Sequence, residues 1–162
     1  MSEWVTGRTE SDVDAAKALM AEIRNNIRTD STWSLDNLTQ AQKSVINTGM
    51  LNSDVISRIW GNVQTLKESL EDNGYYPKDI KQPFVYDETR PESLREGYEQ
   101  FLINAQNMRV AFFVLPSTPL VPDYVYGISE MNQIETIFRD IEHECYVMNS
   151  NIRECGTFEC GE

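Results

Sequence analysis

Residues 129–152 read SEMNQIETIFRDIEHECYVMNSNI, and this stretch decides the fold class. Its apolar residues alternate steps of three and four without a break over three heptads. They are Met131, Ile134, Phe138, Ile141, Cys145, Met148 and Ile152. Because a mean spacing of about 3.5 residues keeps one face of a helix against its neighbour, the stretch predicts a long helix packed at a shallow angle, as in bundles and coiled coils.

Two segments near the N-terminus show a helix-start signal followed by an apolar stripe. Thr9 or Ser11 can cap the first segment. Its stripe is Val13, Ala16, Met20, Ile23 and Ile27. The second segment runs roughly from Ser34 to Thr48 and is expected to end at Gly49. Its less regular stripe is Leu35, Leu38, Ala41 or Gln42, and Val45.

Two further segments also show a helix-start signal followed by an apolar stripe. Asn52 opens one of them, and Asn73-Gly74 supplies the left-handed residue that commonly ends a helix. Its stripe is Ile56, Ile59, Val63, Leu66 and Leu70. The other starts at residues 89–92 (TRPE), a capping box with proline in the first turn. Its stripe is Leu94, Tyr98, Phe101, Ala105, Met108 and Phe112.

These patterns predict a mainly α fold: a helical bundle of about five heptad-striped helices with extended connectors that contain proline. The predicted organisation is a three-helix region (1–74), an extended connector (75–90), a two-helix region (91–152) and a C-terminal arm (153–162), or one single domain overall. A second proline-rich connector covers residues 116–127. The stripe on residues 129–152 leaves two alternatives open, namely packing inside one chain or pairing between chains.

Composition narrows the possible partners. The chain has 14 basic and 26 acidic residues, for a formal net charge of −12. Nucleic acids and anionic lipids bind through Lys and Arg, so we expect no nucleic-acid and no membrane partner. No apolar run approaches the roughly 20 residues that span a bilayer, and we expect no signal peptide. The longest apolar run, residues 110–115 (VAFFVL), has the length of a core segment.

The one histidine, His143, is the natural starting point for a metal site or an activated nucleophile. With Cys145, Cys155 and Cys160 it would form a zinc ligand set, but Cys145 lies on the apolar stripe and His143 points away from it in helical register. We expect free thiols, with Cys145 in the core and His143 in solvent. No G-x-S-x-G elbow or phosphate-binding glycine loop is present. The sequence therefore predicts no catalytic residues, no cofactor, no metal and no enzyme activity.

Aromatic residues outside the stripes and a short C-terminal repeat are the candidates for protein contact. Trp and Tyr anchor protein interfaces because they bury a large area at a low entropic cost. Glu-Cys-Gly occurs at 154–156 and again at 159–161, in a turn-rich tail poorly suited to burial. The interface candidates are Trp4, Trp60, Tyr124, Tyr126, Cys155, Gly156, Phe158, Cys160 and Gly161.

Three stretches together resemble a family of small virion proteins encoded in the tail modules of phages and prophages of Gram-positive bacteria. Residues 4–13 (WVTGRTESDV) are similar to the family's W-x-x-x-R-T-x-x-D-V opening. Residues 51–66 (LNSDVISRIWGNVQTL) are similar to its L-N-x-x-D-x-x-R-I-x-x-N-V-x-x-L helix. The third stretch has T-P-x-x-P from Thr118, NQIE at 132–135, and CGTFECGE at 155–162, where the family has a doubled S-G-E. Here cysteine stands at both serine positions, which indicates a small packing residue.

The resemblance implies a virion structural protein that acts by protein–protein contact in a phage tail, baseplate or fibre-attachment assembly. It implies other tail or baseplate proteins as partners, several copies or a homo-oligomer, and a location in the virion after assembly in the bacterial cytoplasm. It implies no catalytic residues. The acidic charge supports an alternative from another class, a free cytoplasmic regulator that mimics DNA and inhibits a nucleic-acid-binding protein.

Overall fold

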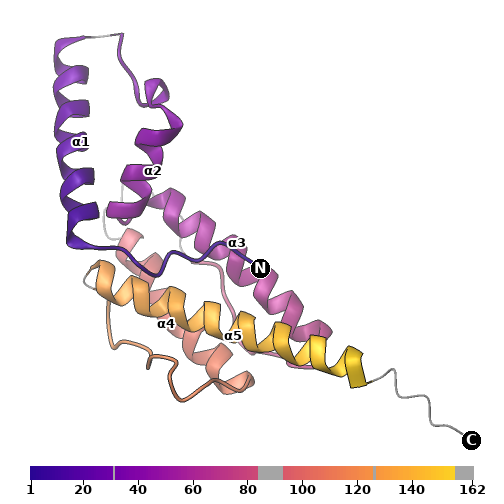
Figure 1. Ribbon diagram of the computed structural model, residues 1–162. Coiled ribbons are helices and arrows are strands. Elements are labelled where there is room, and N and C mark those ends of the chain that lie inside the picture. The colour runs from indigo at the N-terminus through magenta and orange to yellow at the C-terminus, as the bar shows by residue number, and fades with distance from the viewer. Residues whose placement is uncertain (31, 84–92, 126, 156–162) are drawn as a thin grey trace, which may run out of the picture.

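The computed structural model describes residues 1–30, 32–83, 93–125 and 127–155. In this part of the chain there are five α-helices, a single turn of 3-10 helix and no β-strand, so the predicted mainly α fold is confirmed. The helices are α1 (Glu10–Thr29), η1 (Leu35–Asn37), α2 (Gln40–Gly49), α3 (Ser53–Asp72), α4 (Ser93–Ala111) and α5 (Ile128–Cys155). Helices α1 and α2 form a hairpin that projects from a bundle of α3, α4 and α5 (Figure 1).

One apolar core joins α3, α4 and α5, and the stripes predicted for these three helices face it. Its buried members are Val55, Ile56, Ile59, Val63, Leu66, Leu70, Tyr98, Phe101, Ala105, Met108, Phe112, Met131, Ile134, Ile137, Phe138, Ile141 and Cys145. Burying one large apolar side chain contributes about 1.5–3 kcal/mol relative to leaving it exposed. The α5 stripe therefore packs inside the chain, as the intramolecular alternative predicted. The side chains of Leu94 and Ile152 lie outside the described part.

The predicted ends of α3 are confirmed. Its cap is Asn52, whose side chain accepts a hydrogen bond from the Val55 backbone N–H at 3.0 Å. At the other end Gly74 has a φ of 83°, and the Tyr75 N–H donates to the Leu70 carbonyl at 2.9 Å. This left-handed turn lets the chain leave α3 and return along α4. The capping box predicted for α4 falls in residues 84–92, outside the described part.

Glycine allows the two helices of the hairpin to approach closely. A Cβ atom added to Gly49 would lie 2.0 Å from the Asp12 carbonyl oxygen of α1. Thr9 caps α1 in a capping box with Asp12, as the sequence predicts. Within α1 and α2 the buried residues are Ala16, Ile23 and Gly49. The hairpin thus has a thin interior built around one close backbone contact.

The predicted helix over residues 34–48 is wrong in its start and in its stripe. The Asn37 side chain accepts a hydrogen bond from the Ser34 N–H at 2.7 Å and closes the separate turn η1. Thr39 then begins α2 with its own capping box, so local side-chain bonds restart the helix at Gln40. Gly49 is the last helical residue rather than a left-handed stop, because Met50 caps the helix in an extended conformation. Val45 is exposed, and so is Ile27 of the α1 stripe.

Residues 75–83, the described part of the first connector, lie along α4. The buried side chain of Asn104 holds this segment by pairing with both backbone groups of Lys81, accepting from the N–H at 3.1 Å and donating to the carbonyl at 2.8 Å. Tyr75 packs edge-on against Phe112 with ring centroids 4.7 Å apart. In the second connector Arg109 donates to the Pro119 carbonyl.

The main packing partners of α3 are α4 and α5, whereas α1 packs chiefly against α2. The first three helices therefore do not share one interior, although they were grouped in a single region 1–74 by sequence. Domain boundaries stay a prediction. The hydrophobic core decides the packing. It joins α3 to the second half of the chain.

Candidate protein-contact surface

An extended N-terminal segment, residues 2–8, crosses the bundle between α3 and α5 (Figure 1). The carboxylate of Glu142, on α5, accepts hydrogen bonds from the Ser2 backbone N–H at 2.8 Å, the Ser2 hydroxyl at 2.8 Å and the Trp4 indole N–H at 2.9 Å. The Trp4 ring also stacks on Phe138, with centroids 5.6 Å apart. These contacts attach the start of the chain to a helix more than 130 residues away.

Glu135, two helical turns earlier on α5, is a fully buried carboxylate with two arginine partners. Arg8 lies 2.6 Å from it and Arg58, on α3, lies 2.8 Å from it. The Val5 N–H donates to the same carboxylate at 2.8 Å. Asn132 accepts from the Arg8 N–H and donates to the Arg8 carbonyl. We call this set, together with Ser2, Trp4 and Glu142, the N-terminal anchor; it contains two arginines and two carboxylates.

Of the sequence-predicted interface candidates, the structure describes the side chains of Trp4, Trp60 and Tyr124. Trp4 is engaged by the N-terminal anchor, and Trp60 is partly buried against the core of the bundle. Tyr124 lies in the second connector and is half exposed. Cys155 ends α5, but its side chain lies outside the described part. Residues outside the described part altogether are Tyr126, Gly156, Phe158, Cys160 and Gly161.

The positions of His143 and Cys145 agree with their helical register. His143 is exposed, whereas Cys145 is buried, with its sulfur 3.5 Å from the Asn73 side-chain nitrogen and 3.6 Å from the Ser69 hydroxyl. Within residues 1–30, 32–83, 93–125 and 127–155, no three His, Cys, Asp or Glu side chains are grouped so as to hold a metal ion. None of the helices in those ranges is long and apolar enough to cross a membrane.

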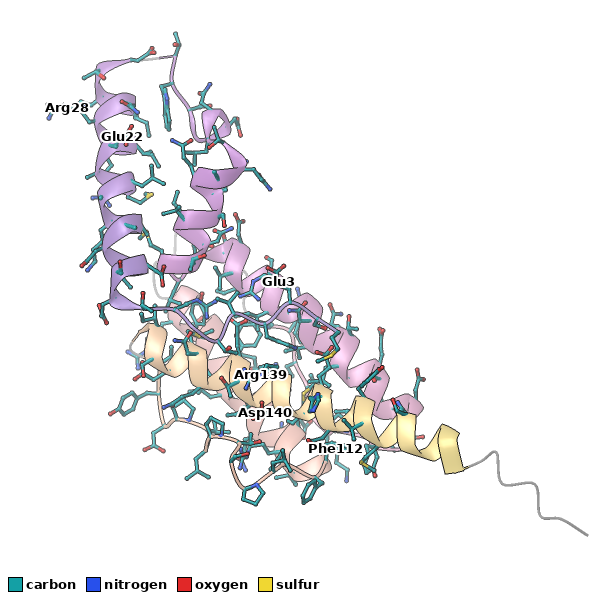
Figure 2. The ribbon with its side chains drawn as sticks, in the orientation of Figure 1. Glu3, Glu22, Arg28, Phe112, Arg139 and Asp140 are labelled. Carbon is teal, nitrogen blue, oxygen red and sulfur yellow. The ribbon has the colours of Figure 1, made fainter. Side chains whose placement is uncertain are left out.

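A hollow of about 430 Å³ lies between α5 and residues 115–119, and Met1 also lines it. Two of its charged side chains pair with each other. Arg139 lies 2.8 Å from Asp140, and these two neighbours on α5 are labelled in Figure 2. Asp140 also accepts from the buried Thr118 hydroxyl at 3.0 Å. The hydrogen bond between Thr118 and Asp140 therefore fastens the second connector to α5.

Exposed apolar side chains gather on α4 and the connector after it. Of eleven exposed large hydrophobic residues in the described part, six lie between residues 103 and 124. Val110 is 77% exposed, Phe113 62% and Leu120 80%. The full set in this stretch is Ile103, Val110, Phe113, Leu115, Leu120 and Tyr124. Single exposed apolar residues are common, but such a concentration indicates a contact surface.

Helix α4 has two apolar registers, which explains why the sequence missed this surface. One register is the buried stripe, which ends in Met108 and Phe112. The other is Ile103, Gln106 and Val110, with steps of three and four, and Phe113 follows it two residues beyond the end of α4 at Ala111; all four of these side chains are exposed. We call this second register the α4 outer seam. Residues 110–115 looked like a core segment, but within that run only Phe112 is buried. The available signal was that Val110 and Phe113 fall outside the buried stripe.

A hollow of about 310 Å³ borders the outer seam. It is lined by Tyr76, Lys78, Asn107, Val110 and Ala111, so Lys78 is its one charged lining residue among those described. The next residue, Asp79, has a left-handed φ of 55°, and its carbonyl accepts from the Asn107 side chain at 3.3 Å.

Burial also acts on the one titratable side chain of the α4 core register. It raises the pKa of the Tyr98 hydroxyl, which therefore keeps its proton and donates to the Asn52 carbonyl at 3.5 Å. This contact ties α4 to the start of α3.

Comparison with protein-family models, with curated proteins and with solved structures found no match.

Proposed function

We propose that this protein is a non-enzymatic structural component of a phage tail, baseplate or fibre-attachment assembly, present in several copies and acting by protein–protein contact. The observation that carries the contact role is the α4 outer seam, whose apolar side chains project into solvent beside a hollow with one lysine. An exposed apolar surface of this kind is typical of a protein-binding surface.

The assignment to a tail is supported by the resemblance of residues 4–13, 51–66 and 118–162. Residues from all three stretches meet in the N-terminal anchor, including Arg8, Arg58, Asn132 and Glu135. They join the first residues, α3 and α5 into one frame. This supports a structural role in a virion, because the anchor keeps the contact surfaces of the protein in fixed positions.

The experiment is to locate the protein in particles. Phage particles produced by a strain that encodes the chain are purified on a density gradient and examined by quantitative mass spectrometry and by immunogold labelling. We expect several copies per particle and label at the tail. Absence from intact particles, with the protein recovered only in the soluble cell fraction, would overturn the proposal.

A binding assay in the same lysate distinguishes the proposed function from the alternative, a DNA mimic. A DNA mimic would bind a basic protein in low salt and release it in high salt, because such contacts are screened within about 10 Å at 0.1 M ionic strength. A matched control is the Val45→Glu variant, which adds one charge to an exposed valine of α2, away from the outer seam. It should enter particles as the wild-type chain does.

A further inference from the structure

We propose that Asn73 is a modification site at which the chain deamidates, and that the folded end of α3 keeps it unreactive until this end opens. In this reaction the Gly74 backbone nitrogen attacks the side-chain amide carbon of Asn73 and forms a cyclic imide. Ammonia leaves and carries away the amide proton of Gly74. Water then opens the imide at either of its carbonyl groups and gives aspartate or isoaspartate. The inference does not rest on the proposed function.

The sequence singles out Asn73 among the asparagines. Asn73-Gly74 is the one asparagine–glycine pair in the sequence. Glycine has no Cβ, so its nitrogen can approach the asparagine side chain without steric hindrance. Gly74 is exposed and Asn73 is half-buried, so water reaches both residues. Local chemistry by itself therefore favours modification at this position.

The backbone at the end of α3 opposes the reaction. Asn73 has a ψ of 8°, which places the Gly74 nitrogen beside the Asn73 nitrogen and away from the Asn73 side chain. Ring closure therefore needs a rotation about the bond between the Cα and the carbonyl carbon of Asn73. The Gly74 N–H donates to the Glu71 carbonyl at 3.0 Å, and the Tyr75 N–H donates to the Leu70 carbonyl at 2.9 Å. The rotation breaks both of these hydrogen bonds, which together form the Schellman motif that ends the helix.

Side-chain contacts hold the same turn in place. The Asn73 amide nitrogen donates to the Ser69 carbonyl at 2.6 Å and lies 3.5 Å from the sulfur of Cys145, which is buried on α5. The Tyr75 ring packs edge-on against Phe112, with centroids 4.7 Å apart. Because these contacts fasten the end of α3 to its neighbours, Asn73 reacts only during a local opening that breaks them. The rate in the folded chain is then the rate in an open chain multiplied by the open fraction.

The product cannot restore the closed end of α3. An ionised carboxylate only accepts hydrogen bonds, so neither aspartate nor isoaspartate can donate to the Ser69 carbonyl as Asn73 does. The new negative charge lies at a helix C-terminus, where the helix dipole disfavours it. Isoaspartate also lengthens the main chain by a methylene group. The reaction therefore turns a transient opening into a lasting change at the point where the first connector leaves α3.

The first test follows the peptide that contains Asn73 while the full chain is incubated in mildly alkaline buffer, with and without denaturing urea. Mass spectrometry detects the conversion of asparagine, and liquid chromatography separates aspartate from isoaspartate. We expect the deamidation rate of the folded chain to be lower than that of the unfolded chain by about tenfold or more. Equal rates would overturn the protection by the fold, and an Asn73 that stays unmodified in urea would overturn the site itself.

The second test uses two neighbouring tyrosines as variant and control. Tyr75→Ala removes the contact with Phe112 and should raise the deamidation rate of the folded chain by about tenfold. Tyr76 is 69% exposed, and Tyr76→Ala should leave the rate unchanged. In urea the wild-type chain and both variants should react equally fast, because the fold no longer holds Asn73.

Circular dichroism checks that both variants are folded. Should Tyr75→Ala fail to fold, Phe112→Leu weakens the same ring contact and takes its place in the comparison. A folded variant that lacks this contact and still deamidates as slowly as the wild-type chain would overturn the proposal that the closed end of α3 controls the reaction.

Discussion

The three-helix bundle and the α1–α2 hairpin are built from similar helices but have very different interiors. The bundle of α3, α4 and α5 buries seventeen residues in one cluster. The hairpin buries Ala16 and Ile23 of α1 and Gly49 of α2. Figure 2 shows Glu22 and Arg28 on the hairpin, well away from Phe112 and Asp140 in the bundle.

The difference shows that a helix needs an apolar stripe to be buried, but that the stripe does not predict how much of the helix is buried. A helix of the bundle has two helical neighbours, so its stripe is covered from both sides. A helix of a hairpin has one such neighbour, and residues such as Ile27 that fall at the edge of the contact stay exposed. We therefore expect the bundle to carry most of the folding free energy, and the hairpin to open locally at a lower cost.

The largest effect should come from the core of the bundle. Phe138→Ala removes a fully buried ring on which Trp4 also stacks, and should lower the free energy of unfolding by about 3–5 kcal/mol. Ile27→Ala, in the hairpin, should change it by no more than about 0.5 kcal/mol. Urea denaturation followed by circular dichroism measures both. Equal losses for the two variants would contradict the comparison.

The N-terminal anchor should come next. Glu135→Gln leaves the buried Arg8 and its neighbour Arg58 without a counter-charge, and should cost about 3 kcal/mol. Glu71→Gln is the control, because it breaks a partly exposed pair with Lys67 that is worth no more than about 0.5 kcal/mol. Hydrogen exchange should also show faster exchange at the Val5 amide in Glu135→Gln. An unchanged Val5 amide would mean that the carboxylate does not hold the segment.

A smaller effect should separate the hairpin from the bundle. Gly49→Ala forces a Cβ against the Asp12 carbonyl, so α1 and α2 must move apart, at a cost of about 1–3 kcal/mol. Amide exchange should accelerate in α1 and α2 and stay slow in α3, α4 and α5. Gly61→Ala is the matched control, since an added Cβ there meets no atom within 4 Å and should stabilise α3 by about 0.5–1 kcal/mol. Acceleration across the whole chain would show that the two regions unfold as one.

The smallest effect concerns the junction between the two regions. Hydrogen bonds from the Thr9 side chain and backbone lower the pKa of Asp12 below 3.8. Because the folded pKa is lowered, the contribution is present above the unfolded pKa and is lost as pH falls through the folded value. The Thr9 amide signal in NMR spectra should therefore titrate with a midpoint below pH 3.8, and Asp12→Asn should abolish this titration. A midpoint at or above 3.8 would contradict the capping geometry.

Helix caps and stripes were readable from sequence because they depend on residues close together in the chain. Thr9, Asn52 and Gly74 act on backbone groups within a few residues, and all three ended or began a helix where expected. Thr39 shows the limit of that approach. It follows the start signal at Ser34 so closely that the pattern predicted one helix where two capping arrangements compete.

The acidic residues show a different limit. The acidic residues that give the chain its net charge of −12 include Glu135 and Glu142, and these two lie inside the molecule. Their partners at the start of the chain are more than 120 residues away in sequence, so no local pattern connects them. The same applies to the α4 outer seam. Its apolar character is visible in the sequence, but its exposure depends on where α3 and α5 pack.

By itself, the sequence determined that the chain is helical, where most helices begin, and which face of α3, α4 and α5 turns inward. These properties follow from propensity, capping and periodicity, which act over one or two helical turns. Only the tertiary structure decided that α3 joins the second half of the chain, that residues 2–8 are held by buried charges, and that Val110 and Phe113 face solvent. Each of these depends on which helices are neighbours in space, and that is settled by the total burial of the whole chain.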